Sequence, residues 1–439
     1  MEQLNNEVRP QQRRKHITPW AWVPSLYFAE GIPYVTVMTI TVIMYKKLGI
    51  SNADIAFYTG WLYLPWVIKP IWSPIVDLFK SKRWWIIVMQ SVIAIAFAGI
   101  AFSIPVPYFF QITLAFAWLL AFSSATHDIA ADGFYMLGLS EADQSRFVGI
   151  RSTFYRAATV FGQGLLVILA GLIEKRTGDI KFSWVVTFAV LAVFFLIFAF
   201  YHGKLLPVPA KDESREERRT FKQLMQEFFG TFVSFFKKKG ILPAMLFLLT
   251  FRLPEAFVVK MINPFLLDPV EVGGLGLATA QVGLVYGTYG IIGLTLGGIL
   301  GGLAVSKGGL KKWLWPMLGS LIIPCLVYVY LAYAQPTSMA IISFCIVLDQ
   351  FGYGFGFTAY MLFMMYFSQG KSQTAHYAIC TGFMALSMML PGMVAGYIQE
   401  AMGYLNFFWF VISTSLFAVV GTLLIKVDPK YGVAEDESK

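Results

Sequence analysis

Long apolar runs recur from one end of the chain to the other, and short polar stretches or glycine and proline separate them. A helix needs about 20 apolar residues to cross a bilayer, and each run reaches that length. The pattern predicts twelve membrane-spanning helices in two sets of six. Their expected ranges are 19–45, 53–79, 83–103, 107–136, 146–173, 182–202, 240–267, 280–305, 313–334, 338–367, 372–400 and 405–426.

Composition supports a lipid environment. The 439 residues are 57% hydrophobic and only 13% charged, which is about half the charged share of a soluble protein. So many apolar side chains exceed what one buried core can hold. The cysteines, Cys325, Cys345 and Cys380, all lie in predicted helices at unrelated spacings, so we expect free thiols, no metal site and no cofactor.

The distribution of lysine and arginine predicts the orientation in the membrane. With both termini inside, the outer loops hold only five of these residues: Lys46, Lys47, Lys175, Arg176 and Lys181. We therefore expect both termini in the cytoplasm. The net charge of +9 fits this asymmetry and an affinity for anionic lipid headgroups. No basic segment is large enough to indicate nucleic-acid binding.

An internal repeat divides the chain into two related halves. The segment AGLIEKRTG from Ala170 matches AGYIQEAMG from Ala395 at an offset of 225 residues, and the same register aligns Glu30 with Glu255. Such duplication is common among transporters. The expected organisation is a cytoplasmic tail (1–18), a six-helix bundle (19–202), a cytoplasmic loop with an interfacial amphipathic helix (203–239), a second six-helix bundle (240–426) and a cytoplasmic tail (427–439).

Ionisable residues inside predicted membrane helices are costly, so each is a functional candidate or part of a structural pair. Asp128 and Asp132 are four residues apart and share one helix face. The next helix runs antiparallel, which places Arg151 near the depth of Asp132 and Arg156 near that of Asp128. Two ion pairs are possible, and they would either pin the helices together or serve function. The repeat places uncharged residues opposite both aspartates, which favours a specialised first half.

Glu30 and Glu255 occupy equivalent positions beside glycine or proline, where the backbone can widen toward a cavity. Buried carboxyl groups favour the neutral form, so both residues are candidates for proton binding; a structural contact with Lys69 or Arg252 is the alternative. The candidates for proton coupling are Glu30, Asp128, Asp132, Glu255 and Asp349. The candidates for substrate binding are Lys69, His127, Arg151, Tyr155, Arg156, Arg252 and Gln350.

Short motifs carry a resemblance to a known family. Asp77 followed by Lys82 and Arg83 resembles the D-x4-[RK] loop motif of the major facilitator superfamily, which latches the cytoplasmic ends of helices. The segments FAEGIP, KPIWSPIVD and THDIAADG resemble the AmpG muropeptide permease branch, whose third pattern is shared with eukaryotic acetyl-coenzyme A transporters. Two positions differ from that branch: His127 replaces a glutamine, and Glu30 replaces a small residue.

The resemblance implies an all-α membrane protein with twelve helices in two pseudo-symmetric six-helix bundles. It also implies a monomeric, proton-driven importer of N-acetylglucosaminyl anhydro-N-acetylmuramyl peptides or related cell-wall fragments, located in the bacterial inner membrane and working by alternating access. A transporter of another anionic or sugar substrate, such as a coenzyme A derivative, stays open. A membrane acyltransferase using His127 and Asp128 is disfavoured, because no second catalytic cluster accompanies them and the repeat would have no purpose there.

Overall fold

The computed structural model describes residues 18–78, 80–139, 141–208, 221–370 and 373–433, and within these ranges some side chains, including that of Asp77, are not described. The described chain is helical and contains no strand. The first half comprises α1 (Val23–Val35), η2 (Thr36–Ile40), α2 (Thr41–Lys47), α3 (Asn52–Trp61), α4 (Leu64–Leu78), α5 (Lys82–Ser103), α6 (Phe109–Gly138), α7 (Glu141–Thr159), η3 (Val160–Leu166), α8 (Val167–Thr177) and α9 (Ile180–Leu205).

The second half comprises α12 (Ile241–Thr250), α13 (Leu253–Leu267), α14 (Thr279–Leu284), η5 (Val285–Gly290), α15 (Ile291–Gly308), α16 (Leu310–Ile322), η6 (Ile323–Cys325), α17 (Leu326–Ala334), α18 (Met339–Ser368) and α19 (Gln373–Leu424). Single-turn helices, η1 (Pro19–Ala21) and η4 (Val270–Val272), precede α1 and follow α13. One more helix, α11 (Phe221–Phe236), lies between the halves in the sequence.

Twelve passes follow from these elements. Ten of the described segments are long and apolar enough to cross a membrane. The last of them contains two passes, because Gly403 has φ 73° and ψ 167° and reverses the chain inside α19. The broken pair α3 and α4 supplies the remaining pass. The prediction of twelve membrane helices in two bundles is therefore confirmed.

The ends of several helices follow from local side-chain chemistry. Ser51, Ser81 and Asp179 each stand before a helix and accept a hydrogen bond from the backbone N–H three residues later, at 2.9–3.1 Å. These bonds satisfy donors that a helix start leaves open. Gly178 ends α8 in the left-handed conformation (φ 73°) that glycine adopts without strain.

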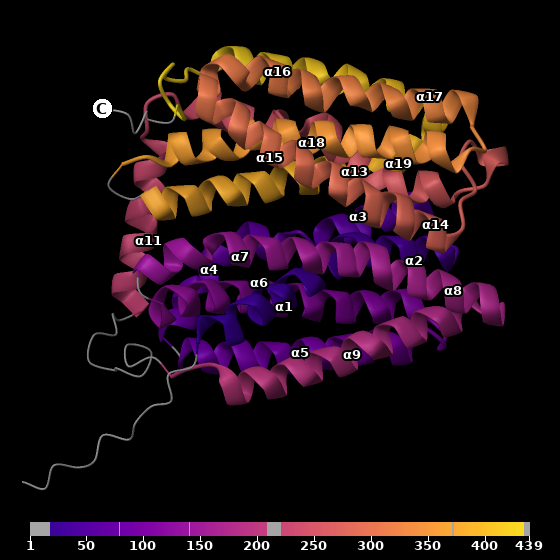
Figure 1. Ribbon diagram of the computed structural model, residues 1–439, viewed down its shortest axis with the longest axis horizontal. Coiled ribbons are helices and arrows are strands. Elements are labelled where there is room, and N and C mark those ends of the chain that lie inside the picture. Colours follow the sequence, from indigo (N-terminus) through magenta and orange to yellow (C-terminus); the bar gives the residue numbers. More distant parts are fainter. Residues whose placement is uncertain (1–17, 79, 140, 209–220, 371–372, 434–439) are drawn as a thin grey trace, which may run out of the picture.

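The two bundles lie side by side, the first half below and the second half above in Figure 1. We call the end that holds α11 and the first and last described residues the terminal end, and the opposite end the distal end. Along their shared interface α8 packs against α14, η3 against η5, and α3 against α19.

Polar contacts join the halves at the distal end. The Asp268 carboxylate of the second half binds Lys46 Nζ at 2.5 Å and accepts from Asn52 Nδ2 at 3.2 Å. Asn52 also donates to Gln399 Oε1 at 2.7 Å, and Glu174 accepts from Thr279 at 2.8 Å. The distal end is thus closed by bonds between the halves.

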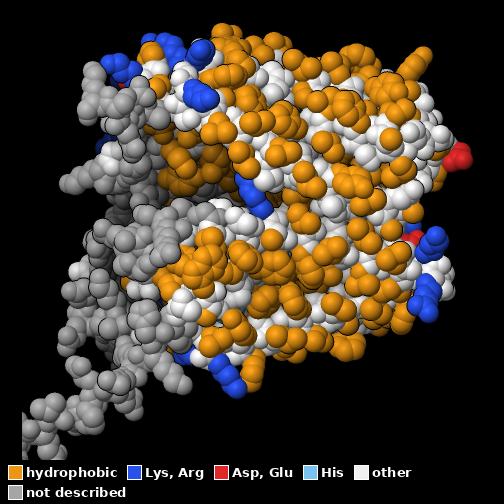
Figure 2. All heavy atoms as spheres, in the orientation of Figure 1, with side chains coloured by type: hydrophobic (Ala, Val, Ile, Leu, Met, Phe, Trp, Pro, Cys, Tyr) orange, Lys and Arg blue, Asp and Glu red, His pale blue; other side chains and the backbone are white. Residues whose placement is uncertain are grey.

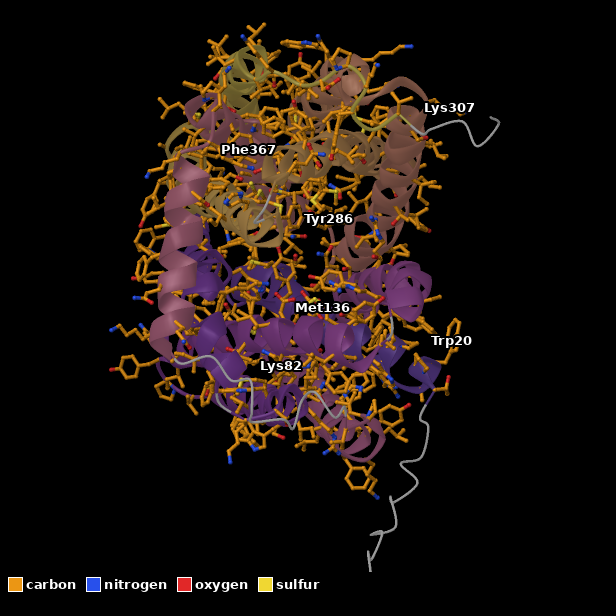
Figure 3. The ribbon with its side chains drawn as sticks, turned by 90° about the vertical axis from the view of Figure 1, so that its left-hand side faces the viewer. Trp20, Lys82, Met136, Tyr286, Lys307 and Phe367 are labelled. Atoms are coloured by element: carbon orange, nitrogen blue, oxygen red, sulfur yellow. The ribbon has the colours of Figure 1, made fainter. Side chains whose placement is uncertain are left out.

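Near the terminal end, the surface is hollowed between the halves (Figure 2). Seen from that end, Met136 of the first half and Tyr286 of the second lie on opposite sides of the opening (Figure 3).

The helix α11 lies along the terminal end and contacts both α4 and α19. Phe235 is buried and packs against Phe367 and Phe383, and Ser234 Oγ lies 2.8 Å from His376 Nε2. The exposed aromatic side chains of α11 include Phe229 (59% exposed). A helix therefore occupies the described part of the central loop, and its location at the membrane surface stays a prediction.

Candidate functional site

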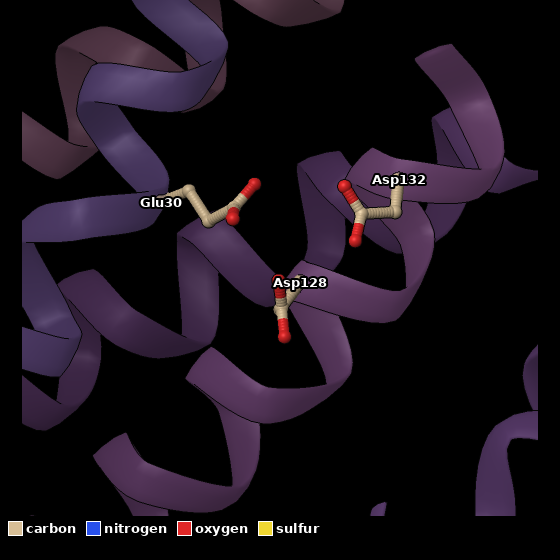
Figure 4. A group of neighbouring side chains, drawn as sticks. All are labelled: Glu30, Asp128 and Asp132. Carbon is tan, nitrogen blue, oxygen red and sulfur yellow. The ribbon is translucent and has the colours of Figure 1, made fainter. Parts of the chain in front are cut away.

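Three carboxyl groups meet in the first half. Glu30 projects from α1 toward Asp128 and Asp132, which project from one face of α6 (Figure 4). One oxygen from each of the three lies within 4.8 Å of the others. Carboxylates this close repel one another, and a proton or a cation among them relieves that repulsion. The cluster can therefore hold a proton or a small cation.

Two basic side chains partly neutralise this cluster. Arg151 Nη2 from α7 pairs with Asp132 Oδ1 at 2.7 Å, and its guanidinium lies 4.5 Å from the centre of the Tyr27 ring. Lys69 from α4 pairs with Asp128. Tyr27 also donates to Asp132 Oδ1 at 3.2 Å.

One of the two predicted ion pairs is present and the other is not. Asp132 pairs with Arg151 as the spacing suggested, whereas Asp128 pairs with Lys69 in place of Arg156. Arg156 is exposed and reaches Thr295 Oγ1 of α15 at 3.5 Å. The reason is the phase of the helix: five residues after Arg151, Arg156 has rotated about 140° away from the face that carries Arg151.

The carboxyl cluster is partly exposed. Side-chain exposure is 17% for Asp128 and 37% for Asp132. Tyr34 is in electrostatic range of Asp128 on one side and of Arg252 and Tyr353 of the second half on the other. Tyr155, a substrate-binding candidate, is in electrostatic range of Tyr34 and Glu30. These phenols therefore line the passage from one half to the other.

The second half has no comparable pairing among its described residues. The Arg252 guanidinium lies 4.6 Å from the Phe357 ring centre and 5.7 Å from that of Tyr360, and it donates to the Tyr353 hydroxyl. Neither oxygen of Glu255 has a hydrogen-bond partner among the described residues. Arg252 is thus a buried cation held by aromatic faces, which suits it to receive an anion.

Asp349 lies deeper in the second half. It is 1% exposed and accepts from Tyr328 OH at 2.6 Å and from Gln350 Nε2 at 3.1 Å. Gln350, a substrate-binding candidate, is therefore already engaged with its neighbour. Asp349 and Glu255 are within electrostatic range of each other, so the second half has an acidic pair of its own.

His127 belongs to a buried polar chain between helices. Its Nε2 lies 3.0 Å from Gln90 Nε2, and Gln90 Oε1 lies 3.0 Å from His202 Nδ1. His202 Nε2 in turn lies 3.0 Å from Ser25 Oγ. These partners favour a packing role for His127 over contact with a substrate.

The proposed latch is only partly described. The side chain of Asp77 lies outside the described residues. Arg83 donates to the backbone carbonyl groups of Gly203 and Leu206, which neutralises the free carbonyl end of α9. The Lys82 side chain is buried and packs against Gly133. Arg83 thus binds the end of α9, and Lys82 packs against α6 of the first half.

Two further residues were not among the predicted site residues. Tyr27 bonds to Asp132 and carries Arg151 on its ring, yet a tyrosine in an apolar helix gives no pattern to find it. Lys260 of α13 is 6% exposed and contacts the first half through Thr59 Oγ1 at 2.7 Å. Its charge inside a predicted membrane helix was the available signal.

Comparison with known proteins agrees with this architecture. The family model for the Major Facilitator Superfamily matches residues 25–375. "Putative transporter AmpG 4" of Rickettsia conorii is 26% identical over 89% of this chain and 92% of its own. "Anhydromuropeptide permease" of Escherichia coli K12 is 23% identical over 92% of this chain and 78% of its own.

Solved structures show the same fold. The crystal structure of a D-xylose-proton symporter superposes with a TM-score of 0.69 at 14% identity, covering 95% of this chain and 99% of that one. A bacterial homolog of the human lysosomal transporter Spinster, in an inward-facing and unoccupied conformation, gives 0.68 at 14% identity, covering 92% and 95%. With a family match over most of its length, the chain belongs to the Major Facilitator Superfamily of membrane transporters, and it is similar to AmpG-type permeases.

Proposed function

We propose that the protein imports anhydromuropeptides, or related cell-wall fragments, across the bacterial inner membrane in symport with protons. The terminal end faces the cytoplasm in this proposal, because the excess of lysine and arginine lies there. The relatives named as AmpG transporters and as anhydromuropeptide permease support the substrate class.

The observation that carries the proposal is the balance of charge in the first half. Glu30, Asp128 and Asp132 supply three carboxyl groups, while Lys69 and Arg151 supply two cations. One added proton makes this cluster neutral. Because Asp128 and Asp132 are partly exposed, that proton can enter and leave as the bundles rock.

The proposed binding of the substrate depends on Arg252 in the second half, opposite the carboxyl cluster. Arg252 lies under three aromatic rings and has no carboxylate within 4.0 Å among the described residues. A carboxylate of the peptide would supply the missing anion, and the Tyr34, Tyr63 and Tyr353 rings nearby provide faces on which sugar rings can stack.

Uptake by purified protein in liposomes tests the proposal. A radiolabelled N-acetylglucosaminyl anhydro-N-acetylmuramyl tripeptide should accumulate when the outside is made acidic, and a protonophore should abolish the accumulation. Acetyl-coenzyme A in excess should leave uptake unchanged. No accumulation under the gradient would reject the proposal, and inhibition by acetyl-coenzyme A would favour the alternative substrate class.

Glu30→Gln separates coupling from binding. We expect it to weaken accumulation under the pH gradient while exchange of labelled for unlabelled substrate continues, since exchange needs no net proton movement. Glu271→Gln, which changes an exposed acid at the distal end, is the matched control. An unchanged response to pH in Glu30→Gln would exclude Glu30 as the coupling acid.

A further inference from the structure

Lys260 is a buried cation for which the described residues provide no anionic partner. Its Nζ donates to Thr59 Oγ1 at 2.7 Å. The Thr59 hydroxyl donates to the Ile55 carbonyl at 2.5 Å, so it can only accept from Lys260. No carboxylate of the described residues lies within 4.0 Å of this ammonium group. Lys46 and Lys69, in contrast, each pair with a carboxylate.

A buried ammonium group with one neutral acceptor is energetically unfavourable. Removing such a charge from water costs several kcal/mol unless an opposite charge compensates. Glu255 lies on the same helix but five residues earlier, so the two side chains are on different faces of α13. The described part of the protein therefore supplies no anion that would compensate the charge of Lys260.

The surroundings of Lys260 do not admit such an anion in the present state. Lys260 lines a small cavity with Met38, Tyr63 and Met388, and the volume of this cavity, about 10 Å³, holds a single water molecule at most. Next to Thr59, Gly60 packs so closely on Met393 that a Cβ there would lie 2.6 Å from Met393 Cγ. Separation of α3 from α13 and α19 would open the site.

That separation is also what opens the distal end. The helix α3 begins at Asn52, which bonds to Asp268 and Gln399 of the second half. Along α13, Lys260 lies between Glu255 and the distal residue Asp268. Arg252 is eight residues further toward the terminal end, or about 12 Å along a helix. A solute entering from the distal end would therefore reach Lys260 before Arg252.

We propose that Lys260 captures a carboxylate of the incoming substrate when the distal end opens, and that Thr59 takes the carboxylate's place when it closes. This inference rests on the proposed function for the identity of the substrate. The walls formed by Met38, Tyr63 and Met388 suit an acid whose charge is attached to an apolar or sugar body. Lys260 is then the first of two cation sites that the substrate passes.

Transport kinetics from each side of the membrane test the inference. With the labelled tripeptide, Lys260→Met should raise KM for entry from the distal side roughly tenfold or more, as loss of a charged hydrogen bond predicts. Lys260→Arg should stay within about threefold of the wild type, because it keeps the charge. KM measured from the terminal side should change far less. Lys175→Met, at an exposed distal position, is the control.

Several results would overturn it: an unchanged KM in Lys260→Met, equal defects in the Met and Arg variants, or equal changes from both sides. Wild-type uptake reports on the proposed function separately.

A second measurement needs no substrate. In a background without native cysteines, Lys260→Cys should react slowly with an anionic, membrane-impermeant thiosulfonate added from the distal side, and faster when Asp268→Asn weakens distal closure. A cysteine that stays unreactive in both would also reject the inference.

Discussion

Individual residues of the two halves differ in how their charges are balanced. In the first half Asp128 and Asp132 each have a basic partner. In the second half Arg252 lies on aromatic rings, and Glu255 has no hydrogen-bond partner among the described residues. Buried charges without partners are unfavourable for stability. Their presence on one wall of the passage is what makes that wall a candidate for binding an anion.

Replacing Asp128 tests which lysine or arginine depends on it. Asp128→Asn should destabilise the protein, because it leaves the Lys69 ammonium group without its anion. Adding Lys69→Met should recover much of that loss, giving a coupling energy of about 0.5–3 kcal/mol in a double-mutant cycle of thermal unfolding. The same cycle with Arg156→Met should give no coupling. Coupling to Arg156 in place of Lys69 would contradict the observed pairing.

How far these pairs could be read from the sequence depends on how local they are. Asp132 and Arg151 lie on consecutive antiparallel helices, so helical spacing alone predicted their ion pair correctly. Asp128 and Lys69 lie on α6 and α4, whose packing depends on the break between α3 and α4 at Leu62. Spacing along one helix does not show such a contact. The contact of Lys260 with Thr59 joins different halves and is equally invisible to periodicity.

Helices of the two halves meet most closely where glycine removes side chains. A Cβ on Gly287 of η5 would lie 2.0 Å from the carbonyl oxygen of Gln163 and 2.5 Å from the nitrogen of Gly164 in η3. Both contacts are with backbone, so neither neighbour can turn aside. The wide turns η3 and η5 therefore form the tightest backbone contact at mid-interface, about which the bundles can rock.

Gly287→Ala should force these two turns apart. We expect a stability loss of about 1–3 kcal/mol, as for other overpacked positions, and slower transport. Gly302→Ala on α15 is the control, because a Cβ there meets nothing within 4 Å. Thermal unfolding in detergent and initial uptake rates measure the two effects. Equal behaviour of the two variants would show that the contact at Gly287 is not tight in the membrane.

The whole molecule is held in its present state by the distal contacts. Asp268 is the centre of that group, since it binds Lys46, Asn52 and the Tyr404 hydroxyl, the last at 2.6 Å. The twelve helices and the duplication could be predicted from hydrophobic length and repeat. Which end closes could not, because closure depends on single polar residues in loops and helix ends.

Asp268→Asn should shift the molecule toward opening at the distal end. The change removes the charge that holds Lys46 while keeping the shape of the side chain. Spin labels on exposed distal residues of opposite halves, such as Lys175 and Glu271, should report longer distances in the variant than in the wild type. Lys181→Gln, at an exposed position of the same end, should leave the distances unchanged. Identical distances in Asp268→Asn would mean that apolar packing alone closes this end.

The position of α11 has a mechanical consequence. A helix of 16 residues is a stiff rod of about 24 Å, and this one touches α4 and α19 at once. A rod fixed between two moving bodies acts as a strut and sets how near they can come. For the terminal end to close, α11 has to tilt or lose its contact with α4 or with α19. The connection between the halves therefore also governs the last step of their closure.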